Sequence, residues 1–162
     1  MADRPSSTQT ETEGRGPDSD DRLRFRDDEP VLDPAVPVDA FAAQPDARAV
    51  RIEPGDDTRE LLPHLDRIAL VEVNFPTFGD GRGYSAARIL REEGYEGELR
   101  AVGDVLVDQI AYMRRCGFDA FAPGAPLDES DVSAALSRFP HVYQHAADEA
   151  RPIWSLRHGA SA

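Results

Sequence analysis

The feature that most constrains this fold is a regular alternation of strand-like and helix-like segments. The strongest strand signal is the apolar run RIALVEVNF, residues 67–75. Weaker strand signals lie over residues 49–53, 97–103 and 118–122, and apolar residues at helical spacing fill the intervals between them. Short connections of this kind predict parallel strands joined by right-handed crossover helices. The chain is therefore predicted to be an α/β protein.

The number of strand signals limits the architecture. Four parallel strands are too few to close an eight-stranded barrel. We therefore expect about four mainly parallel strands with crossover helices. They would form either a small open sheet with helices on both faces or a half-barrel that dimerises. The sequence contains neither the GxGxxG fingerprint of a dinucleotide site nor a phosphate-binding P-loop.

Capping residues and glycines predict where the helices begin and end. A first helix is expected over about residues 57–65. Ser85 is expected to be the N-cap of the second helix, and Asp104 the N-cap of the third, which stops at Gly117. A further helix is predicted over residues 127–139. These boundaries place each helix between two of the predicted strands or directly after the last one.

Composition divides the 162 residues into one domain with two flanks. Residues 1–46 are predicted to be a disordered acidic N-terminal segment followed by a proline-rich linker. Within them, the run RLRFRD, residues 22–27, is a candidate edge strand. The α/β domain is expected over residues 47–145, a length typical of one hydrophobic core. Residues 146–162 are interpreted as a C-terminal tail.

The charge balance excludes several kinds of partner. The chain has 31 acidic and 18 basic residues, a formal net charge of −13, and every basic residue is arginine. A nucleic acid or an anionic membrane requires basic surface, so neither is expected as a partner. The absence of lysine excludes Schiff-base and P-loop lysine chemistry. No apolar run approaches the roughly 18 residues of a membrane helix, and no signal peptide is recognisable, so a cytoplasmic location is expected.

Polar side chains gather in the loops where two predicted strands end. Carboxyl ends of parallel strands meet at one edge of a sheet, where ligands commonly bind. Glycine-flanked backbone, helix N-termini and a guanidinium suit an oxyanion such as phosphate, sulfate or a carboxylate. The alternative is structural, with helix caps at two of the residues and Arg82 paired with Asp104 across the loops. The candidate anion site consists of Asp80, Arg82, Tyr84, Ser85 and Asp104.

Two charged residues fall inside predicted strands. Glu72 lies in the middle of the apolar run 67–75, where a buried carboxylate needs a partner. Arg100 lies in the next strand and is the obvious candidate for that partner. We therefore predict an ion pair between Glu72 and Arg100 inside the sheet.

Neither the cysteine nor the histidines predict a catalytic or metal centre. Cys116 ends a helix at the edge opposite the candidate anion site, and a helix C-terminus disfavours a thiolate, so we interpret it as a buried structural residue. His141 and His145 have helical spacing but lack a recognisable third metal ligand. The residue types thus indicate no catalytic residue and no metal site, and any cofactor is unknown.

The block from Phe75 to Phe121 resembles a bacterial family known as domain of unknown function nine-three-four. The resemblance rests on three motifs: FP-x-F-x-DGRGYS, GELRAVGDV and DQ…RCGFD. In many bacteria, genes of this family lie beside assimilatory sulfite reductase and other sulfate-assimilation genes, and some members carry an oxidoreductase label. The resemblance implies an accessory role in sulfite reduction and cysteine biosynthesis. The partner it implies is sulfite reductase or a related redox protein, which the chain would bind or help to supply with electrons.

Three functions remain open from the sequence. The leading expectation is an accessory protein rather than an autonomous enzyme, because the chain has one cysteine, no dinucleotide fingerprint and no spacing for cluster ligands. The first alternative is a small enzyme that binds an anionic substrate at Arg82, with Asp80 or Asp104 as acid or base. The second alternative is a structural homodimer.

Overall fold

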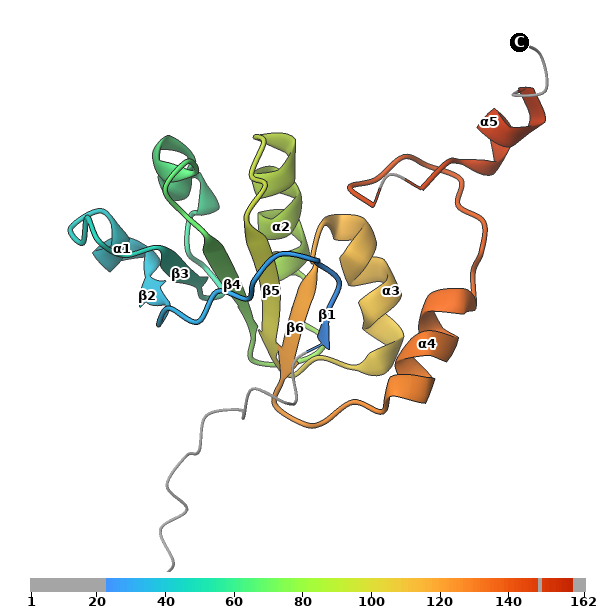
Figure 1. The fold of residues 1–162 in the computed structure, drawn as a ribbon, viewed down its shortest axis with the longest axis horizontal. Coiled ribbons are helices and arrows are strands. Elements are labelled where there is room, and N and C mark those ends of the chain that lie inside the picture. The colour runs from blue at the N-terminus through green and yellow to red at the C-terminus, as the bar shows by residue number, and fades with distance from the viewer. Residues whose placement is uncertain (1–22, 149, 159–162) are drawn as a thin grey trace, which may run out of the picture.

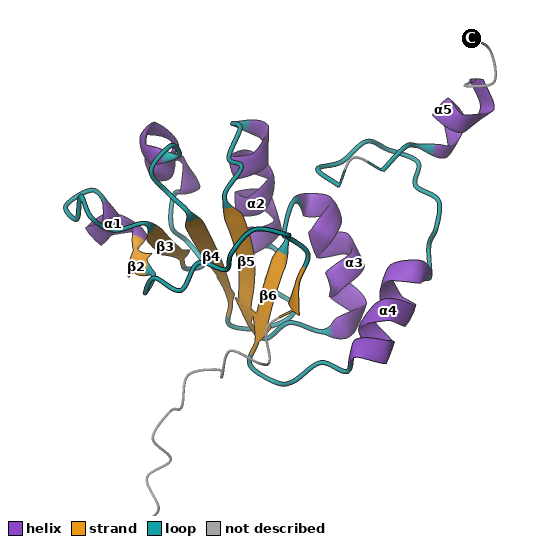
Figure 2. Cartoon of the chain, in the orientation of Figure 1, coloured by secondary structure: helices purple, strands orange, loops and turns teal. Residues whose placement is uncertain are grey.

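The computed structural model describes residues 23–148 and 150–158, in which six strands form one open sheet flanked by helices (Figures 1 and 2). The order of the strands across the sheet is β1-β6-β5-β4-β3-β2, and every neighbouring pair is parallel except β1 with β6. This arrangement confirms the α/β class and the open, mainly parallel sheet. The strands are β1 Leu23–Arg24, β2 Val36–Pro37, β3 Ala49–Ile52, β4 Leu70–Phe75, β5 Glu98–Gly103 and β6 Ala120–Pro123.

The helices follow the strands in a repeating order. Strands β2 to β6 are neighbours in the same order in which they occur along the chain, so right-handed crossovers place the connecting helices on one face of the sheet. This differs from the expectation of helices on both faces, which would require the strand order to reverse within the sheet. The helices are α1 Val38–Phe41, η2 Thr58–His64, α2 Arg82–Glu92, α3 Val107–Cys116, α4 Glu129–Ser137 and α5 Ile153–His158.

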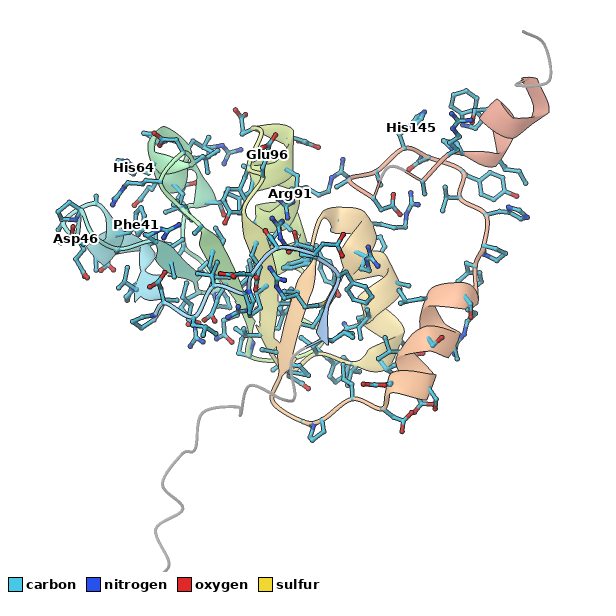
Figure 3. The ribbon with its side chains drawn as sticks, in the orientation of Figure 1. Phe41, Asp46, His64, Arg91, Glu96 and His145 are labelled. Atoms are coloured by element: carbon cyan, nitrogen blue, oxygen red, sulfur yellow. The ribbon has the colours of Figure 1, made fainter. Side chains whose placement is uncertain are left out.

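The hydrophobic core lies between the sheet and these helices. Val71 and Val73 are two residues apart on β4, so both face the helices. They belong to one buried cluster with Leu90 of α2 and Met113 of α3. Phe41 of α1 joins the same cluster and is fully buried (Figure 3). The apolar period of two along the strands and of 3.6 along the helices thus produces a single continuous core.

The opposite face of the sheet carries charged residues and is covered by the segment between β1 and β2. This segment, residues 25–35, crosses in front of the sheet in Figure 1. Arg100 of β5 lies on this face, and its Nη2 donates to the carbonyl oxygen of Val31 at 3.1 Å. The chain therefore shields buried charges with its own N-terminal segment rather than with a second layer of helices.

Residues 36–41, expected to lie in the proline-rich linker, form β2 and α1. Val38 and Phe41 bury their side chains in the core, and this burial offsets the cost of ordering the segment. Pro37 is tolerated because β2 is an edge strand, where no second neighbour needs its missing N–H group. The candidate edge strand in residues 22–27 is present as β1. The acidic residues 1–22 lie outside the described part of the chain.

Two of the predicted helix caps are wrong. Helix α2 begins at Arg82 rather than after Ser85, because Asp80 accepts a hydrogen bond from the backbone N–H of Arg82 at 3.1 Å and so starts the helix earlier. Helix α3 begins after Leu106, not after Asp104, whose side chain bonds a neighbouring loop instead. The first predicted helix is the 3₁₀ helix η2. The helix predicted over residues 127–139 is α4, whose N-cap is Asp128.

The loops after β4 and β5 are pressed together at the carboxyl edge of the sheet. Gly103 pairs with Phe75 in the strand register, and the N–H group of Asp104 donates to the carbonyl oxygen of Phe75 at 2.7 Å. Gly103 has a φ of +93°, and a Cβ atom there would lie 2.4 Å from that oxygen. Glycine is therefore required at this position, and its absence of a side chain allows the two loops to touch.

Candidate functional site

Asp80 and Arg82 form a closed ion pair in the loop after β4. Arg82 Nε donates to Asp80 Oδ1 at 3.0 Å, and Nη2 donates to Oδ2 at 2.6 Å. This two-point contact is the main reason that the pKa of Asp80 is lowered to about 2, and it raises the pKa of Arg82. The guanidinium of Arg82 is therefore neutralised by a residue of its own loop, and not by Asp104 as the structural alternative proposed.

Asp104 holds the neighbouring loop in place. Its Oδ2 accepts a hydrogen bond from the backbone N–H of Phe78 at 2.9 Å, and Gln109 Nε2 donates to the carbonyl oxygen of Phe78 at 2.7 Å. Both backbone groups of Phe78 are thus fixed by side chains of the loop after β5 and the start of α3. The Phe78 side chain is nevertheless 55% exposed, and Leu106 on the holding loop is 42% exposed. This loop pair displays an aromatic ring to solvent on a rigid support.

The remaining two candidates have different surroundings. Tyr84 turns toward the core, where its ring lies 5.5 Å from that of Phe75 and 5.3 Å from that of Tyr112, and burial raises its pKa. Ser85 is exposed in α2 and, together with Arg82 and Asn74, lines a cavity of about 190 Å³. The structure thus joins Asp80 to Arg82, and Asp104 to Phe78, but it does not gather all five residues around one point.

The loops and first helical turns at the carboxyl edge are strongly acidic. Residues 53–60, 76–85, 104–109 and 124–131 contain two arginines, Arg59 and Arg82, against ten carboxylates. Several of these acids complement the N-termini of η2, α2, α3 and α4, where the helix dipole favours negative charge. The acids are Glu53, Asp56, Asp57, Glu60, Asp80, Asp104, Asp108, Asp128, Glu129 and Asp131.

Glu72 and Arg100 form an ion pair within the sheet. The two residues are directly paired in the register of β4 and β5, and Arg100 Nη1 lies 3.1 Å from Glu72 Oε1. The structure adds contacts that the sequence analysis missed, because Arg100 also reaches Glu98 Oε1 at 2.5 Å, and Arg24 Nε reaches Glu98 Oε2 at 2.8 Å. Glu98 and Arg100 share one face of β5 through their spacing of two, which is the signal that would have revealed this partner. The chain of charges holds the sheet to the segment that covers it.

Two further observations concern the described residues as a whole. Within residues 23–148 and 150–158, no group of three or more histidine, cysteine, aspartate or glutamate side chains is arranged to hold a metal ion. In the same part of the chain, no helix has both the length and the apolar character that crossing a membrane requires.

The fold and the site define an α/β protein with an open, mainly parallel sheet, whose carboxyl edge is built from two interlocked loops and is rich in acidic residues. Within this class, the chain belongs to the family described as bacterial protein of unknown function (DUF934), whose model matches residues 49–154. The match runs from the start of β3 into α5 and includes the loops of the carboxyl edge. No curated protein and no solved structure matches the chain.

Proposed function

We propose that this protein is an accessory protein of assimilatory sulfite reduction, in sulfate assimilation and cysteine biosynthesis. It binds the reductase, or a related redox protein that delivers electrons, through the carboxyl edge of its sheet. The link to sulfite reduction comes from what the family resemblance implies about neighbouring genes. The mode of action comes from one structural observation, the exposed and rigidly held ring of Phe78.

Phe78 has the properties of an interface anchor. Aromatic side chains that dominate binding are usually large, well positioned and surrounded by polar residues. The backbone of Phe78 is held by Asp104 and Gln109, so little conformational freedom remains to be lost when the ring enters a partner's pocket. A ring that is 55% exposed contributes less to folding than a buried aromatic side chain does. Its placement is therefore better explained by a partner than by folding.

The charge around Phe78 specifies the kind of surface that it fits. Ten carboxylates and two arginines lie in the loops and first helical turns of the same edge, so a complementary partner surface is basic around an apolar pocket. Opposite potentials of this kind mainly accelerate association and orient the partners. We therefore expect binding to weaken as salt concentration rises, because exposed charges are screened.

The geometry favours docking over an enzyme that binds an anionic substrate at these loops. The guanidinium of Arg82 is occupied by Asp80, and the carboxylate of Asp104 is bonded to the N–H group of Phe78. Binding a substrate at Arg82 would require a two-point contact to open, in which the Asp80 side chain is only 12% exposed. Docking at Phe78 requires no rearrangement of either loop.

The docking proposal is tested by measuring the affinity of the purified protein for the sulfite reductase of the same cell. Replacing Phe78 by alanine is expected to weaken binding about tenfold or more, the effect of losing a central aromatic anchor. Phe139→Ala is the matched control, because Phe139 is 75% exposed and lies after α4, outside the two interlocked loops. Equal affinities for the wild type and Phe78→Ala would refute docking at this edge.

The biological part of the proposal is tested by growth of a strain that lacks the gene. The strain is expected to fail on sulfate and on sulfite as sole sulfur sources and to grow on sulfide or cysteine. Normal growth on sulfite, in a genome without a second copy, would remove the link to sulfite reduction. Complementation with Arg82→Ala separates the alternatives, since a docking protein retains function in this variant and an enzyme that uses Arg82 loses it.

A further inference from the structure

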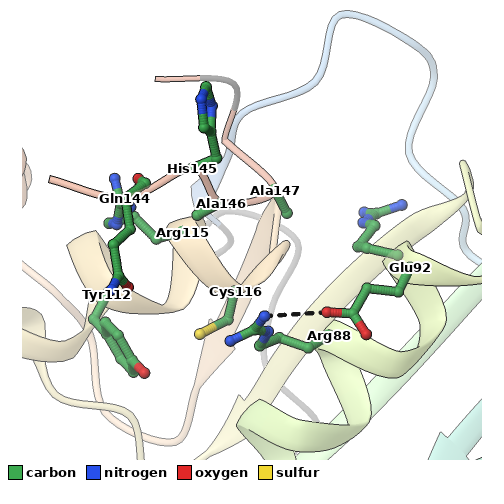
Figure 4. A pocket seen from close by; sticks show the side chains of 10 residues that line it. Arg88, Glu92, Tyr112, Arg115, Cys116, Gln144, His145, Ala146 and Ala147 are labelled. Carbon is green, nitrogen blue, oxygen red and sulfur yellow. Dashed lines mark hydrogen bonds and ion pairs between the residues drawn. The ribbon is translucent and has the colours of Figure 1, made fainter. Parts of the chain in front are cut away.

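A second polar cavity lies at the amino edge of the sheet, opposite the docking edge. Its volume is about 390 Å³, and it forms where α2 and α3 end and the segment 144–147 crosses them (Figure 4). The amino edge also carries Arg91 and His145, which lie on the same side of the molecule (Figure 3). The residues that decide the chemistry of the cavity are Arg88, Arg115, Tyr112 and Cys116.

Arg88 is available to a ligand. Its one carboxylate partner among the described residues is Glu92, at 3.1 Å on the next turn of α2, and the two side chains are 64% and 65% exposed. Such exposed pairs contribute little to stability and exchange readily with solvent or other ions. The guanidinium can therefore contact an anion in the cavity without disturbing the fold.

Arg115 supplies a second guanidinium in a fixed position. Its Nη2 donates to the carbonyl oxygen of Gln144 at 2.7 Å, its Nη1 lies 3.3 Å from Asp148, and its backbone oxygen accepts from Ala147 at 3.1 Å. These contacts tie the segment 144–148 to the end of α3. They leave Arg115 on the wall of the cavity, with 22% of its side chain exposed.

The C-termini of α2 and α3 do not cancel the positive charge of the arginines that line the cavity. Carbonyl groups at the end of a helix carry partial negative charge. In α3 these groups already have donors, because the N–H of Gly117 bonds Arg114 and the N–H of Phe118 bonds Met113. Arg91 donates to the carbonyl oxygen of Gly117 at 3.0 Å. Arg91 also lines the cavity, but its guanidinium is bonded to this helix end and to Asp119, so the anion site is assigned to Arg88 and Arg115.

The thiol of Cys116 carries no negative charge that would repel an anion in the cavity. Cys116 is 3% exposed and lines the cavity on the side of Arg88 (Figure 4). Burial raises the pKa of this thiol, so it is neutral near pH 7. The lining of the cavity consequently includes a neutral thiol, the phenol of Tyr112, the imidazole of His145 and the carboxylate of Glu92. It also includes three guanidinium groups, those of Arg88, Arg91 and Arg115, so arginines outnumber carboxylates by three to one.

We propose that this cavity binds a small tetrahedral oxyanion, such as a phosphate or sulfate group, between Arg88 and Arg115. Guanidinium groups match the geometry of such oxyanions and present several donors to them. A group of this kind can belong to a free ion or to a small ester. The proposal is independent of partner docking, which uses the opposite edge of the sheet.

The test is the midpoint of thermal unfolding in increasing inorganic phosphate, compared with chloride at equal ionic strength. Phosphate at ten times its dissociation constant is expected to raise the midpoint of the wild type by about 4 °C. Arg88→Gln is expected to remove most of this rise. Arg82→Gln is the matched comparison, because its side chain is also 64% exposed and also pairs with one nearby carboxylate, yet it lies at the carboxyl edge. This variant is expected to keep the full rise.

Three results would overturn the proposal: the same rise in chloride, the same rise in Arg88→Gln, or loss of the rise in Arg82→Gln. The last result would place the anion at the carboxyl edge instead. Titration calorimetry with inorganic phosphate and with glycerol phosphate then distinguishes a site for the free ion from a site for an ester. The midpoint of each variant in chloride, measured first, establishes that it is folded.

Discussion

Replacing Arg100 by methionine is expected to destabilise the protein strongly, because it leaves two carboxylates with fewer cationic partners. The Arg100 side chain is 4% exposed and contacts Glu98, whose side chain is 1% exposed, and Glu72, at 14%. Removing one partner of a buried ion pair costs about 3 to 5 kcal/mol. Glu98 keeps Arg24 at 2.8 Å, and Glu72 keeps Arg51 at 2.8 Å. We therefore expect a loss near the lower end, about 3 kcal/mol.

The assay is urea unfolding, with the free energy of unfolding taken from the midpoint at an unchanged slope. Arg88→Met is the control, since its exposed pair with Glu92 is worth less than about 1 kcal/mol. The double variant Glu98→Gln with Arg100→Met is expected to lose less than the sum of the single variants, because the amide removes the most deeply buried of the carboxylates that Arg100→Met deprives of a partner. A loss below about 1 kcal/mol for Arg100→Met would refute the reasoning, because it would equal that of a surface pair.

Three further predictions follow from single residues. Gly103→Ala is expected to lower the free energy of unfolding by about 3 kcal/mol, because the strain of a positive φ adds to overlap with a carbonyl oxygen of β4. Gly94→Ala is the control, also at positive φ but in open space, and is expected to cost about 1 kcal/mol. Equal losses in thermal or urea unfolding would exclude the overlap. The carboxyl group of Asp80 should titrate near 2 by NMR. Its pKa should rise in Arg82→Gln but stay below the ordinary value of about 3.9, because the backbone N–H of residue 82 still donates to it. Because the folded pKa lies below the unfolded one, the stabilising effect is present above about pH 4 and disappears as pH falls toward 2. The thiol of Cys116 is expected to react with a disulfide reagent at pH 8 at least about tenfold more slowly in the folded protein than in urea, and equal rates would contradict its burial.

The parts of the fold that follow from local pattern could be predicted from the sequence. The run RIALVEVNF forms β4 at residues 70–75, and GELRAVG forms β5, because alternating apolar residues are buried on the core face. Gly117 ends α3 in the left-handed conformation that a C-terminal glycine favours. The parallel order then follows from short connections and right-handed crossovers.

Several other features were not predictable from the sequence, because two local caps were equally suitable or because distant segments had to meet. The early start of α2 depends on Asp80 bonding the N–H of Arg82, and Ser85 looks an equally good cap in the sequence. The short strand β2 carries little periodicity of its own, and it forms because β3 offers a free edge. The use of Asp104 as a support for Phe78 depends on two loops meeting in space, for which the sequence contains no local signal.

The cavity at the amino edge also could not be predicted from the sequence. The sequence placed Cys116 at a helix end and favoured a structural role, and its burial agrees with that placement. Arg88 and Arg115 are separated along the chain and lie on different helices. Their convergence on one cavity required the packing of α2 against α3 and the return of the segment 144–147.

The central claim is that Phe78 anchors a partner needed for sulfite reduction. Its most direct test is growth on sulfite of a strain whose gene carries Phe78→Asp, beside a strain that carries Phe139→Asp, with both proteins shown to fold to the wild-type unfolding midpoint. The docking account predicts that the Phe78→Asp strain grows on sulfide but fails on sulfite, while the Phe139→Asp strain grows on both. Normal growth of the Phe78→Asp strain on sulfite would contradict it.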